Sequence, residues 1–266
     1  MNIKYLLLKL IHLTEKNLFC IIRNFLELIF FRQKFSLKYS KPFYVRKYDE
    51  FTNIYFPNKF RSIMYGRGYK FRLNSLAKSY FLNRIKFNEG DTIIDCGANI
   101  GEIFLYFQLK KIKITYYAFE PAENEFICLK KNTNQENLYK KALWKQNTNL
   151  PFFIKSNTAD STVFKIEDYE KKTFVEATKL DSLNLESIKL LKIEAEGAEP
   201  EVLQGSIQTI RKCNYIVVDS GKERGRNFEE TTMSVCNLLI KNNFDLIYID
   251  HIRIVLMFRN AMKEEI

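Results

Sequence analysis

At 266 residues the chain is long enough for one domain with a sizeable core and an appended segment. Lys and Arg outnumber Asp and Glu by 42 to 31, giving a net charge of +11, and the first 50 residues hold ten of these cations and four of the acids. The positive charge thus belongs more to the N-terminus than to the whole protein, which favours an anionic surface over nucleic acid as its partner. An AT-rich genome, which inflates Lys, Asn and Ile, explains the excess equally well.

The scarcity of histidine and the spacing of cysteine exclude several kinds of site. With His12 and His251 as the only histidines, neither a histidine-ligated metal nor a serine-type triad is expected. The cysteines lie far apart without a CxxC pair, which favours reduced thiols in a cytoplasmic protein over a disulfide framework or a zinc site. They are Cys20, Cys96, Cys128, Cys213 and Cys236.

Residues 1–40 are predicted to form an amphipathic N-terminal helical extension. The apolar residues Ile11, Leu18, Ile22, Phe25 and Ile29 share one helical face, and Lys9, Lys16 and Arg23 lie on the opposite face. Such a helix can dock peripherally on the inner face of an anionic membrane, or it can pack on the catalytic domain or a partner subunit. Charges interrupt the apolar runs, so we expect no membrane span, and no small-residue cleavage site marks a signal peptide.

Residues 41–88 are predicted to be an accessory β/α lead-in. Prolines and alternating aromatic residues indicate short strands or a hairpin leading to Tyr65-Gly66-Arg67-Gly68. The glycines either present the guanidinium of Arg67 to an acidic group or form a plain turn. A helix is predicted over Leu76 to Phe87.

Thr92 to Phe107 has the order strand, glycine turn, helix. Thr92 to Asp95 is β-branched and is predicted as a buried strand, and apolar residues recur at helical spacing after Gly101. In a doubly wound sheet this turn lies at the carboxyl edge, where ligands bind. We expect Gly97 and Gly101 to let a ligand approach the backbone, and the helix start to offer free N–H donors.

The next predicted strand, Lys113 to Phe119, ends in Glu120-Pro121. A carboxylate at this strand end can accept hydrogen bonds from both hydroxyls of a ribose, and Glu120 follows Asp95 by about the spacing expected for such a residue. The turn lacks the GxGxxG of dinucleotide binders, and no GxxxxGK[ST] loop exists. The pattern favours an adenosyl ligand without a pyrophosphate, and S-adenosylmethionine (SAM) fits best.

Further strands are predicted at Leu138 to Leu143, Pro151 to Ile154 and Thr173 to Lys179. Trp144 faces either the adenine or the ordinary core. The polar loop Thr158 to Thr162 either closes over the cofactor or is a plain surface loop.

The C-terminal part completes an α/β fold with a Rossmann-like sheet over residues 89–260. Lys189 to Glu194 and Asn214 to Asp219 are predicted as core strands, and Phe228 to Asn243 as a helix. Phe244 to Ile249 and Ile252 to Phe258 are predicted as a terminal hairpin, which makes the last strand antiparallel. This suits a SAM methyltransferase better than a dehydrogenase.

From about Tyr65 to Phe258 the chain resembles FkbM-type methyltransferases. The matching segments are DCGANIG at Asp95 to Gly101, FEP at Phe119 to Pro121, TKLDSL at Thr178 to Leu183 and LKIEAEGAEPEVLQG at Leu191 to Gly205, while YGRG at Tyr65 to Gly68 and DSGKERG at Asp219 to Gly225 are similar to a bacterial branch. The resemblance implies a class I methyltransferase sheet and SAM-dependent O-methylation, often of sugar hydroxyls in surface glycans or of natural products. The family usually has Asp where this chain has Glu194.

The predicted site lies at the carboxyl edge of the sheet. For the cofactor we predict Asp95, Gly97, Ala98, Asn99, Gly101, Glu120, Pro121, Ala142, Leu143 and Asp160. A sugar hydroxyl needs a base, and with histidine scarce we predict Glu196 for this role, with Glu194 as orienter or alternative base and Asp219 beside them. Lys192, in a buried strand, needs an acidic partner. The same residues also suit a satisfied ion network, and a hard cation is possible but not required.

Other classes of protein stay open at this stage. One is an NAD-dependent enzyme acting on sugars, against which the missing GxGxxG and the terminal hairpin both argue. Another is a non-catalytic, membrane-associated scaffold of the same fold, against which the intact acidic residues argue. Nucleic-acid methylation is weaker, because no [ND]PP[YF] motif is present.

Overall fold

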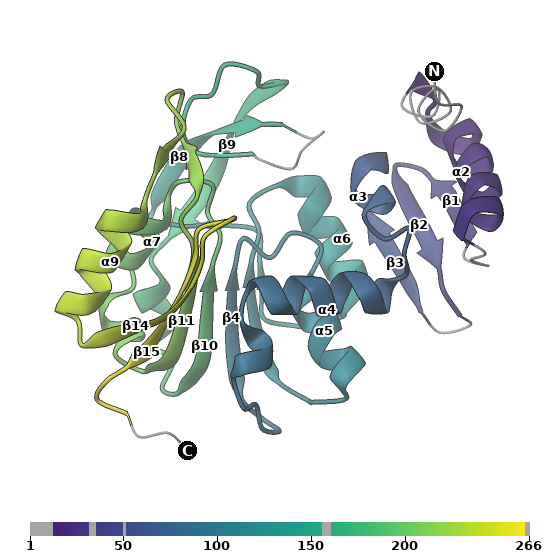
Figure 1. The fold of residues 1–266 in the computed structure, drawn as a ribbon. Helices are drawn as coiled ribbons and strands as arrows, with labels where there is room; N and C mark the ends of the chain where they lie inside the picture. Colours follow the sequence, from purple (N-terminus) through teal and green to yellow (C-terminus); the bar gives the residue numbers. More distant parts are fainter. Residues whose placement is uncertain (1–12, 32–35, 50–51, 156–160, 264–266) are drawn as a thin grey trace.

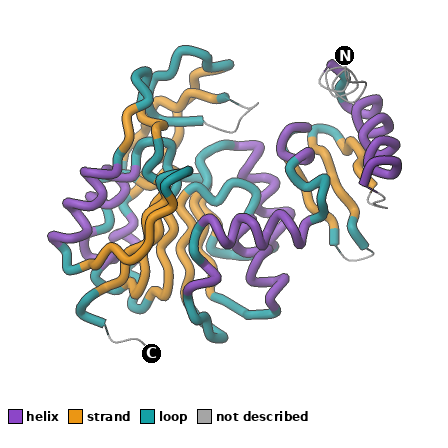
Figure 2. Tube along the Cα trace, viewed as in Figure 1, coloured by secondary structure: helices purple, strands orange, loops and turns teal. Residues whose placement is uncertain are grey.

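The computed structural model describes residues 13–31, 36–49, 52–155 and 161–263. A seven-stranded sheet forms its centre, with the strand order β14-β15-β11-β10-β4-β5-β6 (Figures 1 and 2). The strands β4 (Thr92–Cys96), β5 (Thr115–Phe119), β6 (Leu138–Tyr139), β10 (Ile188–Ile193) and β11 (Cys213–Asp219) run parallel. Only β15 (Val255–Asn260) is antiparallel to its neighbours, β11 and β14 (Phe244–Asp250). This confirms the Rossmann-like α/β fold with an antiparallel C-terminal strand.

Helices cover both faces of the sheet, as the buried side chains show. Ile93 and Leu190 pack into the core beneath α4 (Tyr69–Ser79), α5 (Glu102–Lys110) and α6 (Glu123–Thr133). Their neighbours Ile94 and Leu191 pack into a second core, beneath α7 (Glu199–Gln204), α8 (Ile207–Ile210) and α9 (Thr232–Lys241). All six residues of β10 are buried, as expected for a central parallel strand that is covered on both faces.

The N-terminal part forms a separate unit beside α4 and α6 (Figure 1). It contains α2 (Lys16–Phe31), the antiparallel strands β1 (Ser36–Ser40), β2 (Phe43–Lys47) and β3 (Asn53–Phe56), and α3 (Lys59–Ile63). The strands predicted between residues 41 and 73 are thus present. Ser36–Ser40, which we placed in the helical extension, is a strand instead. In the described part of the chain, every helix is too short or too polar to cross a membrane.

Several predicted boundaries are wrong for identifiable reasons. The helix predicted over Leu76 to Phe87 begins at Tyr69 and ends at Ser79, because Phe81 adopts a left-handed conformation with φ of 56°. The predicted strand Leu138 to Leu143 is divided: β6 joins the central sheet, whereas β7 (Ala142–Leu143) joins a small sheet with β8 (Thr148–Ile154) and β9 (Lys171–Thr178). The helix predicted from Phe228 starts at Thr232, since the hairpin of β12 (Lys222–Arg224) and β13 (Glu229–Glu230) precedes it.

Candidate active site

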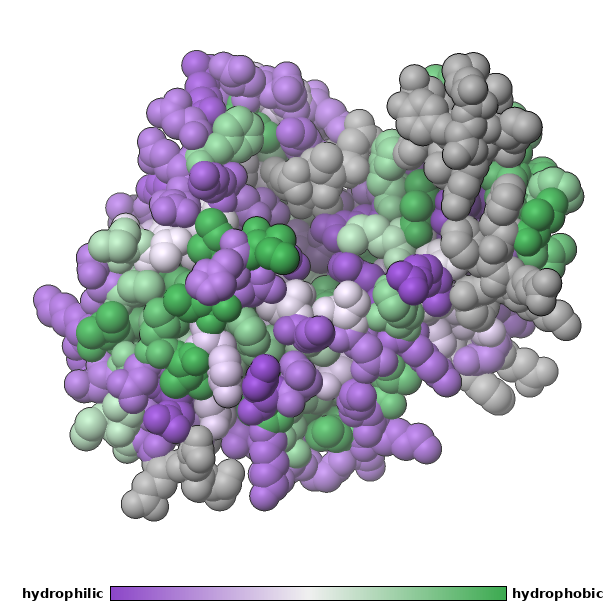
Figure 3. Space-filling view, in the orientation of Figure 1, coloured by the Kyte–Doolittle hydropathy of each residue, from purple (hydrophilic) through white to green (hydrophobic). Residues whose placement is uncertain are grey.

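A cavity of about 740 Å³ opens at the carboxyl ends of β4, β5 and β10. From β4 the chain adds β5 and β6 on one side of the sheet and then β10 and β11 on the other, and ligands commonly bind at such a switch in direction. Figure 3 shows the surface hollowed between the small sheet and the N-terminal unit. We call this the first cavity. Of the predicted cofactor residues, those on its wall are Gly97, Asn99, Glu120, Pro121, Ala142 and Leu143.

The glycine turn packs tightly against neighbouring protein. A Cβ on Gly97 would lie 1.9 Å from the carbonyl oxygen of Glu194, and one on Gly101 would lie 2.5 Å from Cγ2 of Thr133. Both residues have positive φ, at 72° and 87°. Both glycines thus make room for neighbouring protein; Gly97 also lies on the wall of both cavities, whereas Gly101 lines neither cavity described here.

The backbone amides of the turn are also used within the protein. Those of Gly97 and Ala98 donate to the carbonyl of Phe119, and that of Gly101 donates to the carbonyl of Ala98. These three amides are therefore not free to donate to a ligand at the start of α5. Ala98 itself lies on the wall of a second cavity rather than the first.

Glu120 is held rigidly at the end of β5. Its Oε2 accepts a hydrogen bond from the amide of Asn99 at 2.8 Å, and its Oε1 accepts one from the amide of Ala122 at 2.9 Å. Burial raises the pKa of Glu120 to about 8, with the charge of Glu125 adding to the effect. The carboxyl group is oriented by two donors and retains lone pairs for a ligand in the first cavity.

One side of the first cavity is apolar. Its lining residues Phe119, Ala142, Leu143, Phe152 and Val163 suit a planar base, and the ring of Tyr139 stacks on Phe119 with centroids 4.8 Å apart. Trp144 does not line the cavity and packs near Phe164, with ring centroids 6.2 Å apart.

The polar loop before Val163 contributes through its last residues. Ser161 and Thr162 line the first cavity, and the hydroxyl of the buried Thr162 donates to the carbonyl of Glu196 at 2.8 Å. The end of this loop is therefore part of the site rather than a plain surface loop. The predicted cofactor residue Asp160 lies outside the described residues.

A second, strongly polar cavity of about 770 Å³ adjoins the first. The residues that line both are Arg61, Gly97, Asn99, Glu194 and Glu196. The N-terminal lead-in forms much of the second wall through Met64, Arg72, Leu76 and Tyr80, and the rest includes Asp95, Lys192, Glu223 and Arg253.

Lys192 pairs with two of the predicted acids. Its Nζ lies 3.0 Å from Asp95 and 3.1 Å from Glu194, and it donates to the carbonyls of Cys96 and Gly97. Although burial opposes the charge, these two carboxylates raise the pKa of Lys192 well above its usual value. Asp95 also accepts from the hydroxyl of Tyr116 at 2.7 Å, so this predicted cofactor residue faces the second cavity and not the first.

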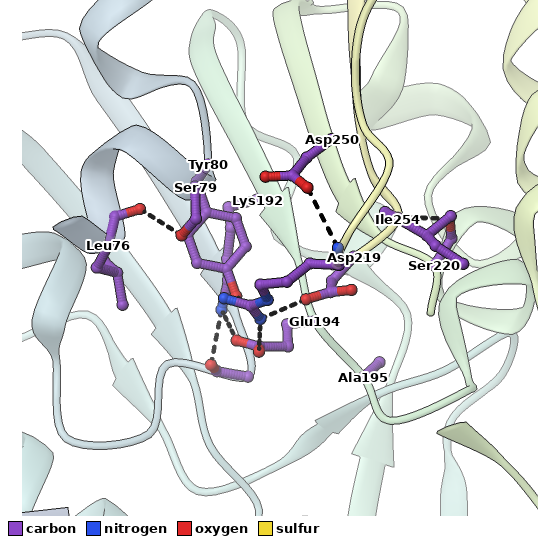
Figure 4. A network of polar contacts seen from close by, with 12 residues as sticks. Leu76, Ser79, Tyr80, Lys192, Glu194, Ala195, Asp219, Ser220, Asp250 and Ile254 are labelled. Atoms are coloured by element: carbon purple, nitrogen blue, oxygen red, sulfur yellow. Dashed lines mark hydrogen bonds and ion pairs between the residues drawn. The ribbon is translucent and has the colours of Figure 1, made fainter. Parts of the chain in front are cut away.

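Glu194 lines the second cavity, and Asp219, which lines neither cavity, lies close to it (Figure 4). These two acids and Glu223 have contrasting pKa values. Burial acts against ionisation of Glu194, but Lys192 and Arg253 lower its pKa to about 2. Burial, reinforced by the charge of Glu194, raises the pKa of Asp219 to about 6, even though Arg253 pairs with it. Burial followed by the charge of Asp219 raises the pKa of Glu223 to about 8. Glu194 is therefore a weak base, Asp219 is a stronger one that is mostly ionised at neutral pH, and Glu223 holds its proton there.

The loop after β10 is fixed by Glu199, whose Oε1 accepts from the amides of Ala195 and Gly197, both at 3.0 Å. Glu201 makes a bidentate pair with Arg224, at 2.7 and 2.9 Å. Both residues thus have structural roles. Glu196 adopts a left-handed φ of 51° in this loop and lies on the wall of both cavities.

Several site residues were missed by the sequence reasoning. Arg61, Arg72, Tyr80, Glu223 and Arg253 all line the second cavity, but they come from the lead-in and from C-terminal turns. Arg67, which we considered for an acidic group, is exposed and stacks on Phe71 with its guanidinium carbon 3.8 Å from the ring centroid. Arg61 and Arg72, on either side of the YGRG segment, line the second cavity, whereas no residue of YGRG itself does. Within the described residues, no cluster of acidic, cysteine or histidine side chains is arranged to hold a metal ion.

Together, the sheet, its antiparallel hairpin and a carboxylate beside a glycine turn define a Rossmann-like methyltransferase. A family model described as Methyltransferase FkbM domain matches residues 95–251, more than half of the sequence, so the chain belongs to this family. SAM is accordingly the cofactor. The first cavity fits it, because an apolar slot lies beside Glu120, and Asn99 has a buried Oδ1 without a hydrogen-bond partner among the described residues.

Individual relatives are distant. Methyltransferase 1 of Beauveria bassiana (strain ARSEF 2860) is 25% identical over 169 residues, which cover 51% of this chain and 68% of that protein. The crystal structure of methyltransferase FkbM from Methylobacillus flagellatus KT superposes with a TM-score of 0.47 and 13% identity over 76% of this chain. This match spans 55% of that protein, just over half its length. M. capricolum TrmK, solved with S-adenosyl-homocysteine, gives a TM-score of 0.39 and 14% identity over 71% of this chain and 68% of that one.

Proposed function

We propose that the protein transfers a methyl group to an oxygen, most suitably a sugar hydroxyl of a surface glycan or of its lipid-linked precursor. The observation that carries this proposal is the second cavity, which adjoins the cofactor cavity and is lined by carboxylates and cations. A polyhydroxylated acceptor matches such a wall, because each hydroxyl group both donates and accepts hydrogen bonds. The FkbM resemblance points to the same class of acceptor.

The chain's own residues have two tasks in this reaction. SAM, when bound, supplies a methyl group on a positively charged sulfur. The protein aligns the acceptor oxygen with that methyl group, and such positioning supplies much of the rate. It also removes the hydroxyl proton, because a protonated hydroxyl is a poor nucleophile.

Glu196 is the base in this proposal. It lies where the two cavities meet, next to both the acceptor and the cofactor. Glu194 shares that position, but its low pKa and its pairs with Lys192 and Arg253 leave it little basicity and suit it to orienting neighbouring groups. Asp219, with a pKa of about 6, is the alternative base.

The proposed cofactor contacts are Gly97, Asn99, Glu120, Pro121, Ala142 and Leu143, all on the first cavity. Asp95 and Lys192 support the site instead, since their ion pair joins β4 to β10 beneath the glycine turn. Ala98 lies on the acceptor side of the turn. Asp160 is also proposed as a cofactor contact, and this proposal is based only on its position in the polar loop.

We expect Glu196→Gln to lower turnover about 10²–10⁴-fold, the usual loss for a general base, and to leave SAM affinity nearly unchanged. Gln preserves the size of the side chain, so packing changes little. Turnover is measured with the methylated acceptor as readout, and SAM affinity by titration calorimetry. Glu230→Gln, an exposed change on β13, serves as the matched control and should behave like wild type. Wild-type turnover in Glu196→Gln together with an inactive Asp219→Asn would reassign the base.

The acceptor is identified by mass spectrometry of surface glycans from cells with and without the gene. We expect deletion to remove one methyl group per repeat, and complementation by the wild-type gene, but not by Glu196→Gln, to restore it. Glycans that are identical in all three strains would exclude the glycan acceptor. Titration calorimetry that detects NAD binding and no SAM binding would contradict the methyltransferase function itself.

A peripheral membrane position is the corresponding proposal for the N-terminal unit. The outer side of α2 exposes Leu18, Ile21, Phe25, Leu28 and Ile29. The first 50 residues carry ten cations and four acids, which complements an anionic lipid surface. A location on the inner face of the membrane would bring the site close to a lipid-linked acceptor.

A further inference from the structure

Arg61 differs from the other cations of the second cavity because it lacks an ionic partner. Lys192 pairs with Asp95 and Glu194, Arg253 with Glu194 and Asp219. Arg72 makes a bidentate pair with Glu102 at 2.8 and 3.0 Å. Within the described residues no carboxylate lies within ion-pair distance of Arg61, and its Nε is buried without a hydrogen-bond partner. A buried guanidinium N–H without an acceptor is costly unless a ligand supplies one.

The backbone holds Arg61 at the junction of the two cavities. It lies in α3, and its amide donates to the side chain of Asn58, the residue that caps this helix, at 2.9 Å. Its side chain lines both cavities. The carboxyl groups of Glu102 and Glu125, at the starts of α5 and α6, are close enough for the charge of Arg61 to lower their pKa values, although burial has the largest influence on both.

The distribution of polar groups along the first cavity matches the two ends of one ligand. The apolar residues and Glu120 line the first cavity alone, where an adenosine fits. Arg61 and Asn99 lie at the opening toward the second cavity, and Asn99 has the buried, unpartnered Oδ1. An amino-acid group carries a carboxylate and an ammonium, which need a cationic donor and an acceptor, respectively.

We propose that Arg61 binds the carboxylate of the methionine part of SAM, while Oδ1 of Asn99 accepts a hydrogen bond from its amino group. This inference rests on the proposed function and deepens it, because it assigns the cofactor's amino-acid end to a residue of the N-terminal unit. A guanidinium is suited to the task, since it donates two parallel hydrogen bonds to a carboxylate. The amino-acid end of SAM then fills the opening between the two cavities and separates the adenosine from the acceptor.

The test compares two ligands that differ at this end of the molecule. S-adenosylhomocysteine has the amino-acid group, and 5′-methylthioadenosine lacks it. In titration calorimetry we expect Arg61→Gln to weaken S-adenosylhomocysteine roughly 10–100-fold, the equivalent of a lost charged hydrogen bond, and to leave 5′-methylthioadenosine unchanged. Unchanged binding of the second ligand also shows that the variant is folded. Arg61→Lys, which keeps the charge but not the planar fork, should lose less.

Arg67→Gln is the matched control, because Arg67 belongs to the same segment but is exposed and stacked on Phe71. Both ligands should bind it as they bind wild type. The proposal is overturned if Arg61→Gln binds S-adenosylhomocysteine like wild type, as it would if Arg61 held an anionic group of the acceptor instead. It is also overturned if both ligands weaken equally. If wild-type protein binds neither SAM nor S-adenosylhomocysteine, the proposed function fails as well, so the two failures are distinguishable.

Discussion

Among single residues, Glu120 shows how one side chain serves both the fold and the cofactor. Its two oxygens accept from the amides of Asn99 and Ala122, so it ties the glycine turn to the start of α6. We expect Glu120→Ala to weaken SAM binding by roughly 1–3 kcal/mol, the range for leaving a buried hydrogen-bonding group without its partner. Titration calorimetry measures the change, and Glu123→Ala, an exposed acid on the same helix, is the control. Equal affinities in wild type and Glu120→Ala would place the ribose elsewhere.

The sequence could predict those site residues that follow core strands directly. Glu120 and Glu194, which line the cavities, could be predicted because apolar runs mark the strands and the carboxyl ends of parallel strands share one edge. Arg61 and Arg253 could not be found in this way. Arg61 lies in a five-residue helix and Arg253 in a turn, and only tertiary packing brings both to the second cavity.

At the scale of single elements, α2 has its faces arranged differently from the prediction. Arg23, predicted on a solvated basic face, is buried and pairs with Glu27, which also takes two hydrogen bonds from the buried Arg46, both at 2.7 Å. Phe19 packs edge-on against Tyr44 of β2. The helix is therefore packed on protein along one side, although its partner is the N-terminal sheet rather than the catalytic domain. A buried ion pair cannot be recognised from helical spacing, because Arg and Glu at i and i+4 also pair on solvated helix faces.

The predicted apolar face of α2 is largely exposed, with Leu18, Phe25 and Ile29 each more than half accessible to solvent. We expect the protein to float with anionic liposomes at low salt and less at high salt, because screening weakens the electrostatic attraction. Substituting these three residues by Ser should abolish flotation, whereas Phe174→Ser, at an exposed residue of β9, should not. If the wild-type protein ignores anionic liposomes at low salt, the docking proposal is wrong. A shift from dimer to monomer in the triple variant would show that a second copy covers the face instead.

For the molecule as a whole, the sequence predicted the sheet better than the site, because the two depend on different interactions. The sheet follows from apolar runs such as Ile188–Ile193, which are readable locally. The second cavity is assembled from the lead-in, the ends of β4 and β10 with the turns after them, the start of α5, and the C-terminal residues Glu223 and Arg253. Its wall therefore depends on how the N-terminal unit packs beside α4 and α6, and residues 41–88 contribute to the site in addition to leading into the sheet.

The acids gathered in this cavity link the site to the stability of the whole protein. Glu223 lies near Asp219, Glu199 and Glu194, whose charges together with burial raise its pKa to about 8, and Arg253 is the cation that opposes them. An unfolded chain releases this proton near the ordinary glutamate pKa of about 4.5. Between these two values the folded protein holds a proton that the unfolded chain has lost, so raising the pH favours unfolding. The contribution of Glu223 to stability is full below about 4.5 and is lost as the pH rises through about 8.

We therefore expect Glu223→Gln, which cannot ionise, to become progressively more stable than wild type as the pH rises from 5 to 9. Thermal unfolding at pH 5, 7 and 9 gives the difference in Tm between the two proteins, and this difference should be largest at pH 9. Glu229→Gln, exposed on the same β12–β13 hairpin, should show a difference that does not depend on pH. A pH-independent difference for Glu223→Gln would mean that Glu223 is ionised in the folded protein. Glu223 destabilises the folded protein at neutral and high pH, and destabilising polar groups of this kind are typical of functional sites.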